Sequence, residues 1–309
     1  MTTLLVSQRN FDSHATPNGH PERPERLRVI EQALSAERFA PLLRKDAPSA
    51  DLNLAELVHA PGYLDALRRV RPAEGINRID EDTFISAGSL DACATALGAG
   101  LLALESVVLG EVRNAFCAVR PPGHHAEIEQ PMGFCLINTI AIVAREAQRK
   151  HGAERVAIVD FDVHHGNGTQ DIFKADASVL YASSQQMPLF PGTGSPSETG
   201  VGNLVNVALP AGSNGALMRE AYEARIFPAL EAFAPDFVLI SAGFDADYRD
   251  PLAGLNWVSE DYGWITARLM EIAERRCDGR IVSLLEGGYD RNGLAGGVAA
   301  HVAALMGKS

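Results

Sequence analysis

A group of carboxylates and histidines in the middle of the chain has the residue types and spacing of a metal site. Asp160, Asp162 and His164 alternate along the segment DFDVHH, so the three side chains leave an extended strand on one side. Asp245, which ends SAGFD, is the natural third ligand beside Asp162 and His164. Two carboxylates and one imidazole without a thiolate are typical of a catalytic metal ion with open positions for water and substrate. Taken singly, each acid could instead cap a following helix.

Two adjacent histidines, His124 and His125 in PPGHHA, could supply acid and base catalysis beside such a metal. The chain has nine histidines, and four of them form two adjacent pairs. One such pair is often a surface accident, but chance is a weak account of both. Asp160 is available to hold one imidazole ring and Asn167 the other.

The segment Glu286-Gly287-Gly288-Tyr289 is the third catalytic feature. Its glycines permit a tight turn with close backbone approach, and the tyrosine hydroxyl could donate a hydrogen bond to a developing oxyanion. A tyrosine after a strand more often packs, but beside a metal and paired histidines catalysis is favoured. The sequence has no nucleophilic Ser or Cys motif, phosphate-binding loop or dinucleotide-binding fingerprint. Together these features predict attack of metal-activated water on an acyl carbon, meaning amide or ester hydrolysis.

The elements that must position these residues form a regular alternation of strands and helices. Buried parallel strands are predicted from apolar, β-branched runs at 115–119, 156–161, 179–183, 237–242 and 281–285. Helical spacing follows at 137–148, 216–233 and 261–276, the last with Ser259 as its N-cap. This pattern predicts one α/β domain over residues 1–309, with a mostly parallel central sheet and helices on both faces. The catalytic candidates follow the carboxyl ends of the strands, which converge on one crevice in such sheets.

The composition is that of an ordinary globular protein. The 309 residues are 46% hydrophobic and 21% charged, with a net charge of −12. No apolar run approaches the roughly 20 residues of a membrane helix, and the best, 96–104, is broken by two glycines. Four scattered cysteines and the lack of a basic and then apolar N-terminal stretch predict a cytoplasmic protein with free thiols. The acidic balance argues against direct nucleic-acid binding, and a homo-oligomer is compatible with the sequence.

A series of segments in order along the chain resembles the signature blocks of the zinc-dependent histone deacetylase family. These segments are RPPGHHAE, GFCLINTIAI, VDFDVHHGNGTQ, FPGTG, SAGFDAD and LLEGGYD. The resemblance implies the arginase/deacetylase fold. Asn167 in HHGNG, together with PPGHHAE and GFC, resembles the class II branch, to which many bacterial deacetylases and acetylpolyamine amidohydrolases are related.

The resemblance also implies a role for each matching residue. It implies one catalytic Zn²⁺ bound by Asp162, His164 and Asp245. His124 would be the histidine partnered by Asp160, and His125, backed by Asn167, would handle the proton of the attacking water. Tyr289 would polarise the acetyl carbonyl.

Substrate and potassium sites are implied in the same way. The tunnel for the lysine stem would have Phe134 and Phe190 as its walls, with further substrate contacts from Thr83, Gly133, Gly288 and Leu252. The substrate backbone is expected to contact Asp82 or Thr83. A structural K⁺ would be held by carbonyls of Asp160 and His164 with Asp162 and Ser183. The chain departs from its relatives at Ser183-Ser184-Gln185, where they commonly read Ser-x-His.

The substrate stays open between acetyl-lysine side chains and small acetylated amines such as polyamines. In the polyamine-selective eukaryotic relative, a glutamate follows the proline of the GDP segment, and Leu252 stands at that place here. The leucine favours acetyl-lysine. A metal-binding pseudo-enzyme would be expected to have lost Tyr289, a dyad histidine or a ligand, and none is lost. Zinc and iron(II) are not distinguished by the sequence.

Overall fold

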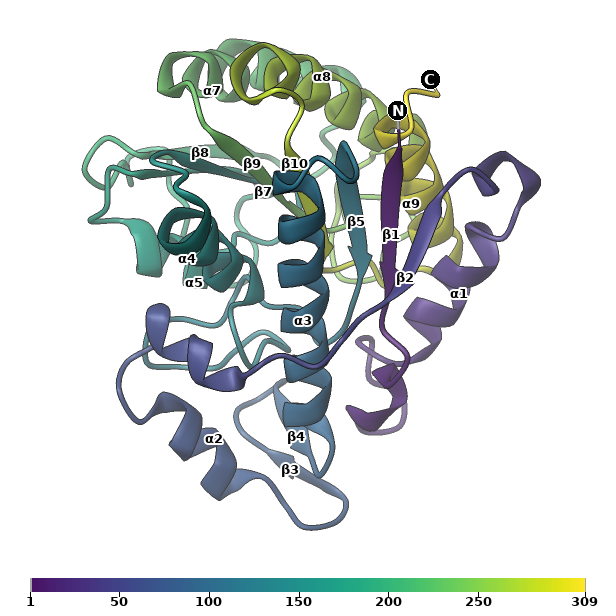
Figure 1. Ribbon diagram of the computed structural model, residues 1–309, viewed down its shortest axis with the longest axis vertical. Coiled ribbons are helices and arrows are strands. Elements are labelled where there is room, and N and C mark those ends of the chain that lie inside the picture. Colours follow the sequence, from purple (N-terminus) through teal and green to yellow (C-terminus); the bar gives the residue numbers. More distant parts are fainter. Residues whose placement is uncertain (1, 309) are drawn as a thin grey trace.

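The computed structural model describes residues 2–308, and a sheet of eight strands runs through its centre (Figure 1). All neighbouring strands are parallel, in the order β2-β1-β5-β10-β9-β6-β7-β8. Their bounds are β1 Thr3–Ser7, β2 Leu43–Asp46, β5 Asn114–Ala118, β6 Val156–Asp160, β7 Val179–Gln186, β8 Leu204–Leu209, β9 Phe237–Ala242 and β10 Ile281–Leu285. A separate antiparallel hairpin is formed by β3 (Ile76–Arg78) and β4 (Phe84–Ser86).

Helices cover both faces of the sheet, as predicted. One face packs against α2 (Tyr63–Val70), α3 (Ser89–Val108), α4 (Thr139–His151) and α5 (Asn167–Phe173). The other face packs against α1 (Glu25–Ala33), α6 (Gly215–Ala221), α7 (Phe227–Phe233), α8 (Ser259–Cys277) and α9 (Arg291–Leu305). Neighbouring strand residues alternate between the two cores, so that Leu4 belongs to the first and Leu5 to the second. Because both cores are apolar, the central strands read as continuous hydrophobic runs.

The strand order brings four functional strand ends together. β5, β10, β9 and β6 are neighbours at the centre of the sheet, although the chain reaches β9 and β10 only after β8. The connection from β5 to β6 therefore passes over two strand positions that are filled later. In open parallel sheets such a change in strand order opens a crevice at the carboxyl edge. The ends of these four strands and the segments that follow them carry the predicted catalytic residues and the three predicted zinc ligands, from Asp160 at the end of β6 to Asn167 at the start of α5.

Most predicted elements are confirmed, and the differences have local causes. β9 and β10 have the predicted bounds, and β7 continues to Gln186 beyond the predicted end at 183. The helix predicted at 216–233 is divided into α6 and α7 by a π-helical turn at Tyr222–Ile226. Ser259 is not the N-cap of α8 but its first residue. The N–H of Val258 donates to Asp261 Oδ2 at 2.9 Å, so the carboxylate three residues after Val258 does the capping.

Among the described residues, α3 is the one helix long and apolar enough to cross a membrane. No membrane-spanning run is predicted from the sequence, because Gly98 and Gly100 interrupt the apolar stretch 96–104. In the structure, 72% of the most apolar part of α3 is buried. The helix crosses in front of the sheet in Figure 1 and packs against α4, β5 and β10. This burial explains its apolar composition as that of a core helix.

A fully buried ion cluster ties the N-terminal segment to the end of β5. Arg120 donates two hydrogen bonds to Glu22, from Nε to Oε1 at 2.8 Å and from Nη2 to Oε2 at 2.7 Å. Arg26 Nη1 lies 3.3 Å from Glu22 Oε1, and both Arg120 and Glu22 are 0% exposed. Although burial opposes ionisation, Arg120 holds the pKa of Glu22 well below its usual range.

Removing this carboxylate should destabilise the protein strongly. We expect Glu22→Ala to lower the free energy of unfolding by about 3–5 kcal/mol, since it leaves two guanidinium groups without their buried counter-charge. Glu25→Ala is the matched control: its ion pair with Arg28 is half exposed and should contribute about 1 kcal/mol or less. Urea unfolding of both variants checks this, and equal losses would contradict a special role for Glu22.

Candidate active site

Three side chains on two strand ends converge as a candidate metal site. Asp162 and His164 follow β6, Asp245 follows β9, and one ligand atom of each lies within 4.8 Å of the others. His164 Nδ1 is 3.2 Å from Asp162 Oδ1 and 3.1 Å from Asp245 Oδ2. All three side chains are buried. The structure thus brings together the ligand set that the resemblance implies.

The donor types and the charge of this cluster fit a divalent cation. Burial, together with the charge of Asp162, raises the pKa of Asp245 to about 7, because two buried carboxylates repel each other. A bound cation would offset that repulsion. Gly287 leaves the necessary space, since a Cβ there would collide with the carboxylates of Asp162 and Asp245. Backbone N–H groups orient the same carboxylates: Gly287 donates to Asp162 Oδ2 at 2.8 Å and Val163 to Asp245 Oδ1 at 2.9 Å.

The two histidines after β5 lie side by side, with ring centroids 4.0 Å apart. His124 Nδ1–H donates to Asp160 Oδ2 at 2.9 Å, and His125 Nδ1–H donates to Asn167 Oδ1 at 2.8 Å. Each ring therefore has the partner that the sequence predicts. With Nδ1 engaged in both rings, the Nε2 atoms remain for chemistry in the crevice.

The surroundings of the two rings push their pKa values apart. Burial lowers the pKa of each, but Asp160 and two further carboxylates overcome this and raise the pKa of His124 to about 10. Burial and the neighbouring His124 and His164 hold the pKa of His125 well below its usual range. At neutral pH the pair is thus one charged and one neutral imidazole, which is the division that acid and base roles require.

Glu286, for which the sequence predicts no separate role, holds the backbone of the histidine pair. Its Oε2 accepts the N–H groups of Gly123 at 2.7 Å and His124 at 3.2 Å, and Oε1 accepts the Ser241 hydroxyl at 3.1 Å. The carboxylate is buried, and burial raises its pKa to about 7. The only sequence signal for this role is an acid directly after a buried strand.

The turn that carries Tyr289 is held from two sides. Arg26 donates from Nε to the Gly288 carbonyl at 2.8 Å and from Nη2 to the Glu286 carbonyl, with its guanidinium 5.0 Å from the Tyr289 ring centroid. Asp250 Oδ2 accepts the Tyr289 N–H at 2.7 Å. Burial, opposed by Arg26, raises the pKa of Tyr289 well above its usual range, so the hydroxyl stays protonated and can donate.

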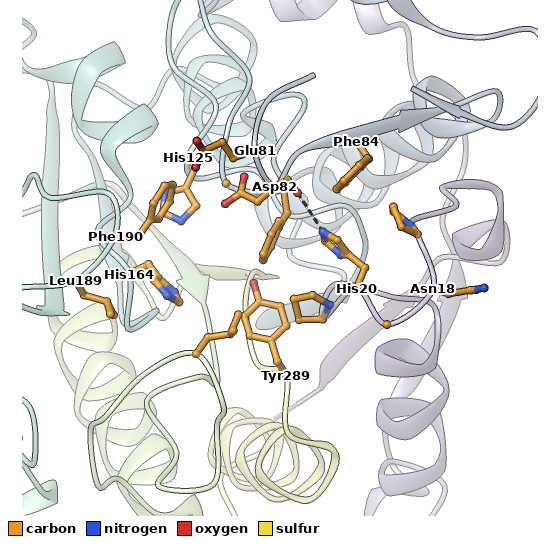
Figure 2. A pocket seen from close by; sticks show the side chains of 16 residues that line it. Asn18, His20, Glu81, Asp82, Phe84, His125, His164, Leu189, Phe190 and Tyr289 are labelled. Carbon is orange, nitrogen blue, oxygen red and sulfur yellow. Dashed lines mark hydrogen bonds between the residues drawn. The ribbon is translucent and has the colours of Figure 1, made fainter. Parts of the chain in front are cut away.

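Two of the predicted catalytic side chains, His125 and Tyr289, and the candidate ligand His164 open into a pocket of about 590 Å³ (Figure 2). Figure 2 shows His125, His164 and Tyr289 around the same space, although they come from three different strand ends. The walls are largely aromatic: Phe134 meets the Tyr289 ring edge-on at 5.7 Å, and Phe190 meets His125 edge-on at 5.2 Å. Such a pocket suits a long aliphatic chain that ends at a polar reacting group.

The predicted substrate residues divide into two groups. Those that line the pocket are Gly133, Phe134, Phe190 and Leu252. Thr83 and Gly288 are not among the described residues that line it. Thr83 is fully buried, and its hydroxyl accepts the Phe134 N–H at 3.1 Å and donates to Asp82 Oδ1 at 3.1 Å. It therefore supports the pocket wall, whereas Asp82 itself lines the mouth.

The departure at Ser183-Ser184-Gln185 has a visible structural consequence. Ser183 stands beside Asp160 in the register of β6 and β7, and its hydroxyl donates to Gln185 Oε1 at 2.9 Å. Gln185 Nε2 donates to the Gly194 carbonyl at 2.6 Å. The glutamine thus anchors the loop that carries Phe190. The potassium site implied for Asp160, Asp162, His164 and Ser183 stays a prediction.

Comparison with known proteins agrees with this geometry. Residues 20–305 match the family described as the histone deacetylase domain. Histone deacetylase 10, chloroplastic, of Oryza sativa subsp. japonica is 39% identical over 94% of this chain and 70% of its own length. The histone deacetylase-like amidohydrolase of Pseudomonas aeruginosa is 38% identical over 88% of this chain and 73% of its own length. The crystal structure of the HDA15 HD domain matches with a TM-score of 0.92 and 33% identity, covering 100% of this chain and 91% of that one.

The sheet topology and the crevice at its carboxyl edge define a hydrolase with the arginase/deacetylase fold. The chain belongs to the histone deacetylase family, as its sequence segments predict, and its general function is that of a deacetylase.

Proposed function

We propose that the chain hydrolyses the acetyl amide of acetyl-lysine side chains with one Zn²⁺ held by Asp162, His164 and Asp245. The observation that carries this proposal is the meeting of three buried ligands, a neutral imidazole and a protonated tyrosine at one aromatic-walled pocket. When bound, the metal ion supplies Lewis-acid activation of water and of the amide carbonyl.

The chain's own residues divide the remaining work. His125 is neutral and has Nδ1–H bonded to Asn167, so the lone pair of Nε2 can take a proton from the attacking water. The ring can then give that proton to the nitrogen of the leaving amine as the C–N bond breaks. His124, kept charged by Asp160, stabilises the negative charge that develops beside it. The Tyr289 hydroxyl donates to the carbonyl oxygen as that oxygen becomes an oxyanion.

The substrate preference follows from the pocket wall. Phe134, Phe190 and Leu252 offer apolar surface on which the methylene groups of a lysine stem can pack. A side-by-side assay of an acetyl-lysine peptide, acetylputrescine and acetylspermidine tests this preference. We expect the peptide to have the highest kcat/KM, and a parent enzyme that prefers acetylspermidine would contradict the proposal.

Acetylpolyamine hydrolysis is the second candidate function, and one observation favours it. Glu81 and Asp82 lie at the mouth of the pocket in Figure 2, and no Lys or Arg of residues 2–308 lines it. These acids would attract the ammonium groups that an acetylated polyamine keeps, because unscreened negative charge steers cations, whereas the acetyl-lysine side chain is neutral. The deciding position is Leu252 in the pocket lining, where an ammonium would lose water without gaining a counter-charge.

Leu252→Glu should therefore shift the enzyme toward polyamines. We expect the ratio of kcat/KM for acetylspermidine over the acetyl-lysine peptide to rise by about tenfold, or about 1.4 kcal/mol, because the carboxylate can pair with the secondary ammonium. Leu252→Gln is the control of equal size without charge and should leave the ratio near that of the parent. If both variants give the same ratio, the charge at this position has no part in selectivity.

A further inference from the structure

Behind the proposed base His125 lies an amide whose two ends are chemically different. Asn167 begins α5 and turns Oδ1 toward His125 Nδ1 at 2.8 Å. The oxygen of an amide can only accept and its NH₂ group can only donate, yet the two ends have nearly the same shape. Rotation by half a turn would present NH₂ to His125. The ring would then have to keep Nδ1 unprotonated and carry its proton on Nε2, which faces the pocket.

One neighbouring side chain decides between these two orientations. Asn167 Nδ2 donates to Glu127 Oε1 at 2.6 Å, and it also lies 3.2 Å from Met132 Sδ and, at the longer distance of 3.5 Å, from the His125 carbonyl. A carboxylate has no proton to donate, so the turned amide would place its oxygen against the negative charge of Glu127. Only the orientation seen here satisfies both His125 and Glu127.

The partner histidine has no such requirement. His124 is backed by Asp160, whose carboxylate accepts at either oxygen, and which in turn receives hydrogen bonds from Tyr181 and from the Asp162 N–H. Because both oxygens of the Asp160 carboxylate accept hydrogen bonds, rotation of this side chain would still leave an acceptor facing His124. Of the two side chains that hold the histidine rings, only the Asn167 amide therefore needs a further residue to fix its orientation.

We propose that Glu127 is a positioning residue that holds Asn167 in one orientation and, through it, keeps the proton of His125 on Nδ1. The proposal rests on the proposed function, in which His125 Nε2 takes the proton of the attacking water. Glu127 is half-buried in the loop that follows the histidine pair and does not line the pocket.

A cycle of four proteins tests this role: the parent, Glu127→Ala, Asn167→Asp and the double variant, all loaded with Zn²⁺. In the parent background, Glu127→Ala lets the amide turn, and we expect kcat to fall about tenfold or more while KM and metal content stay unchanged. In the Asn167→Asp background the residue behind His125 accepts at both ends. Loss of Glu127 should then leave kcat unchanged or raise it, because two carboxylates no longer face each other. Glu129→Ala, an exposed acid in the same loop, is the matched control and should behave like the parent.

An equal loss of kcat from Glu127→Ala in both backgrounds would overturn the proposal, because a general structural role predicts that result. A second readout does not depend on activity. Nitrogen NMR of the imidazoles in ¹⁵N-histidine-labelled protein reports which ring nitrogen carries the proton, and His125→Ala identifies the signals. We expect an Nδ1-protonated His125 in the parent and a mixture of tautomers in Glu127→Ala. The same tautomer in both would overturn the positioning role. A tautomer shift together with full activity of His125→Ala would instead overturn the proposed base.

Discussion

Asp245→Ala should yield a folded protein that holds no stoichiometric metal and has no measurable deacetylase activity. The side chain is one of only three ligands proposed, and the remaining Asp162 and His164 cannot fix an ion with open positions. Loss of a Lewis acid that contributes about 4 kcal/mol or more to the transition state lowers kcat by roughly 10³-fold or more. Metal analysis of the purified variant and acetate release from an acetyl-lysine peptide measure the two effects together.

Two further variants separate loss of the ligand from loss of the fold. Asp245→Asn keeps an oxygen that can accept the Val163 N–H, now at 2.9 Å from Oδ1, and should preserve thermal stability while losing the metal. Asp65→Ala removes an exposed acid on α2 and should retain full metal content and activity. An Asp245→Ala protein that is active without metal would remove this site from the mechanism.

Tyr289→Phe should lower kcat by roughly 10²–10³ with little change in KM or metal content. The hydroxyl is proposed to interact with the carbonyl oxygen only as negative charge develops there, so its loss affects the transition state more than the bound substrate. The ring itself should stay in place, because Arg26 and Asp250 hold the backbone of its turn and Phe134 makes an edge-on contact with it. Steady-state kinetics with an acetyl-lysine peptide measure the effect.

His125→Ala is the natural comparison for the tyrosine variant. The kcat of His125→Ala should fall at least as far as that of Tyr289→Phe, because the attacking water then lacks its base. Activity of Tyr289→Phe within a few-fold of the parent would show that the tyrosine only packs. The catalytic interpretation of the EGGYD turn would then be wrong.

The parts of the fold that the sequence predicts are those with strong local signals. β6, β9 and β10 are buried on both faces and read as apolar, β-branched runs, and the polar residues at their ends stand out against them. β2 is an edge strand with the sequence LRKD and mostly exposed side chains, so nothing in its pattern distinguishes it from a loop. The π-helical turn at Tyr222–Ile226 likewise leaves the helical spacing of the surrounding residues nearly intact.

The residues that support the site have no local sequence signal that predicts their role. Glu286 accepts from His124 across 162 positions of sequence, and Arg26 reaches the carbonyls of the Tyr289 turn across 260 or more. These partners meet only because the strand order places β5 beside β10 and because α1 packs against α9, the helix that follows β10. A single sequence contains the residue types but not their distances. Thr83 shows the same limit at short range, since its neighbour Asp82 lines the pocket and Thr83 points inward.

Acetate release from an acetyl-lysine peptide, measured on one protein sample before chelation, after chelation and after addition of Zn²⁺, tests the proposed chemistry most directly. We predict that activity disappears together with the bound metal and returns when about one equivalent of Zn²⁺ is restored, since one ion is expected per site. A hydroxamate, which chelates such an open site, should block the restored activity. Full activity in protein shown to contain no metal would contradict metal-dependent deacetylation at Asp162, His164 and Asp245.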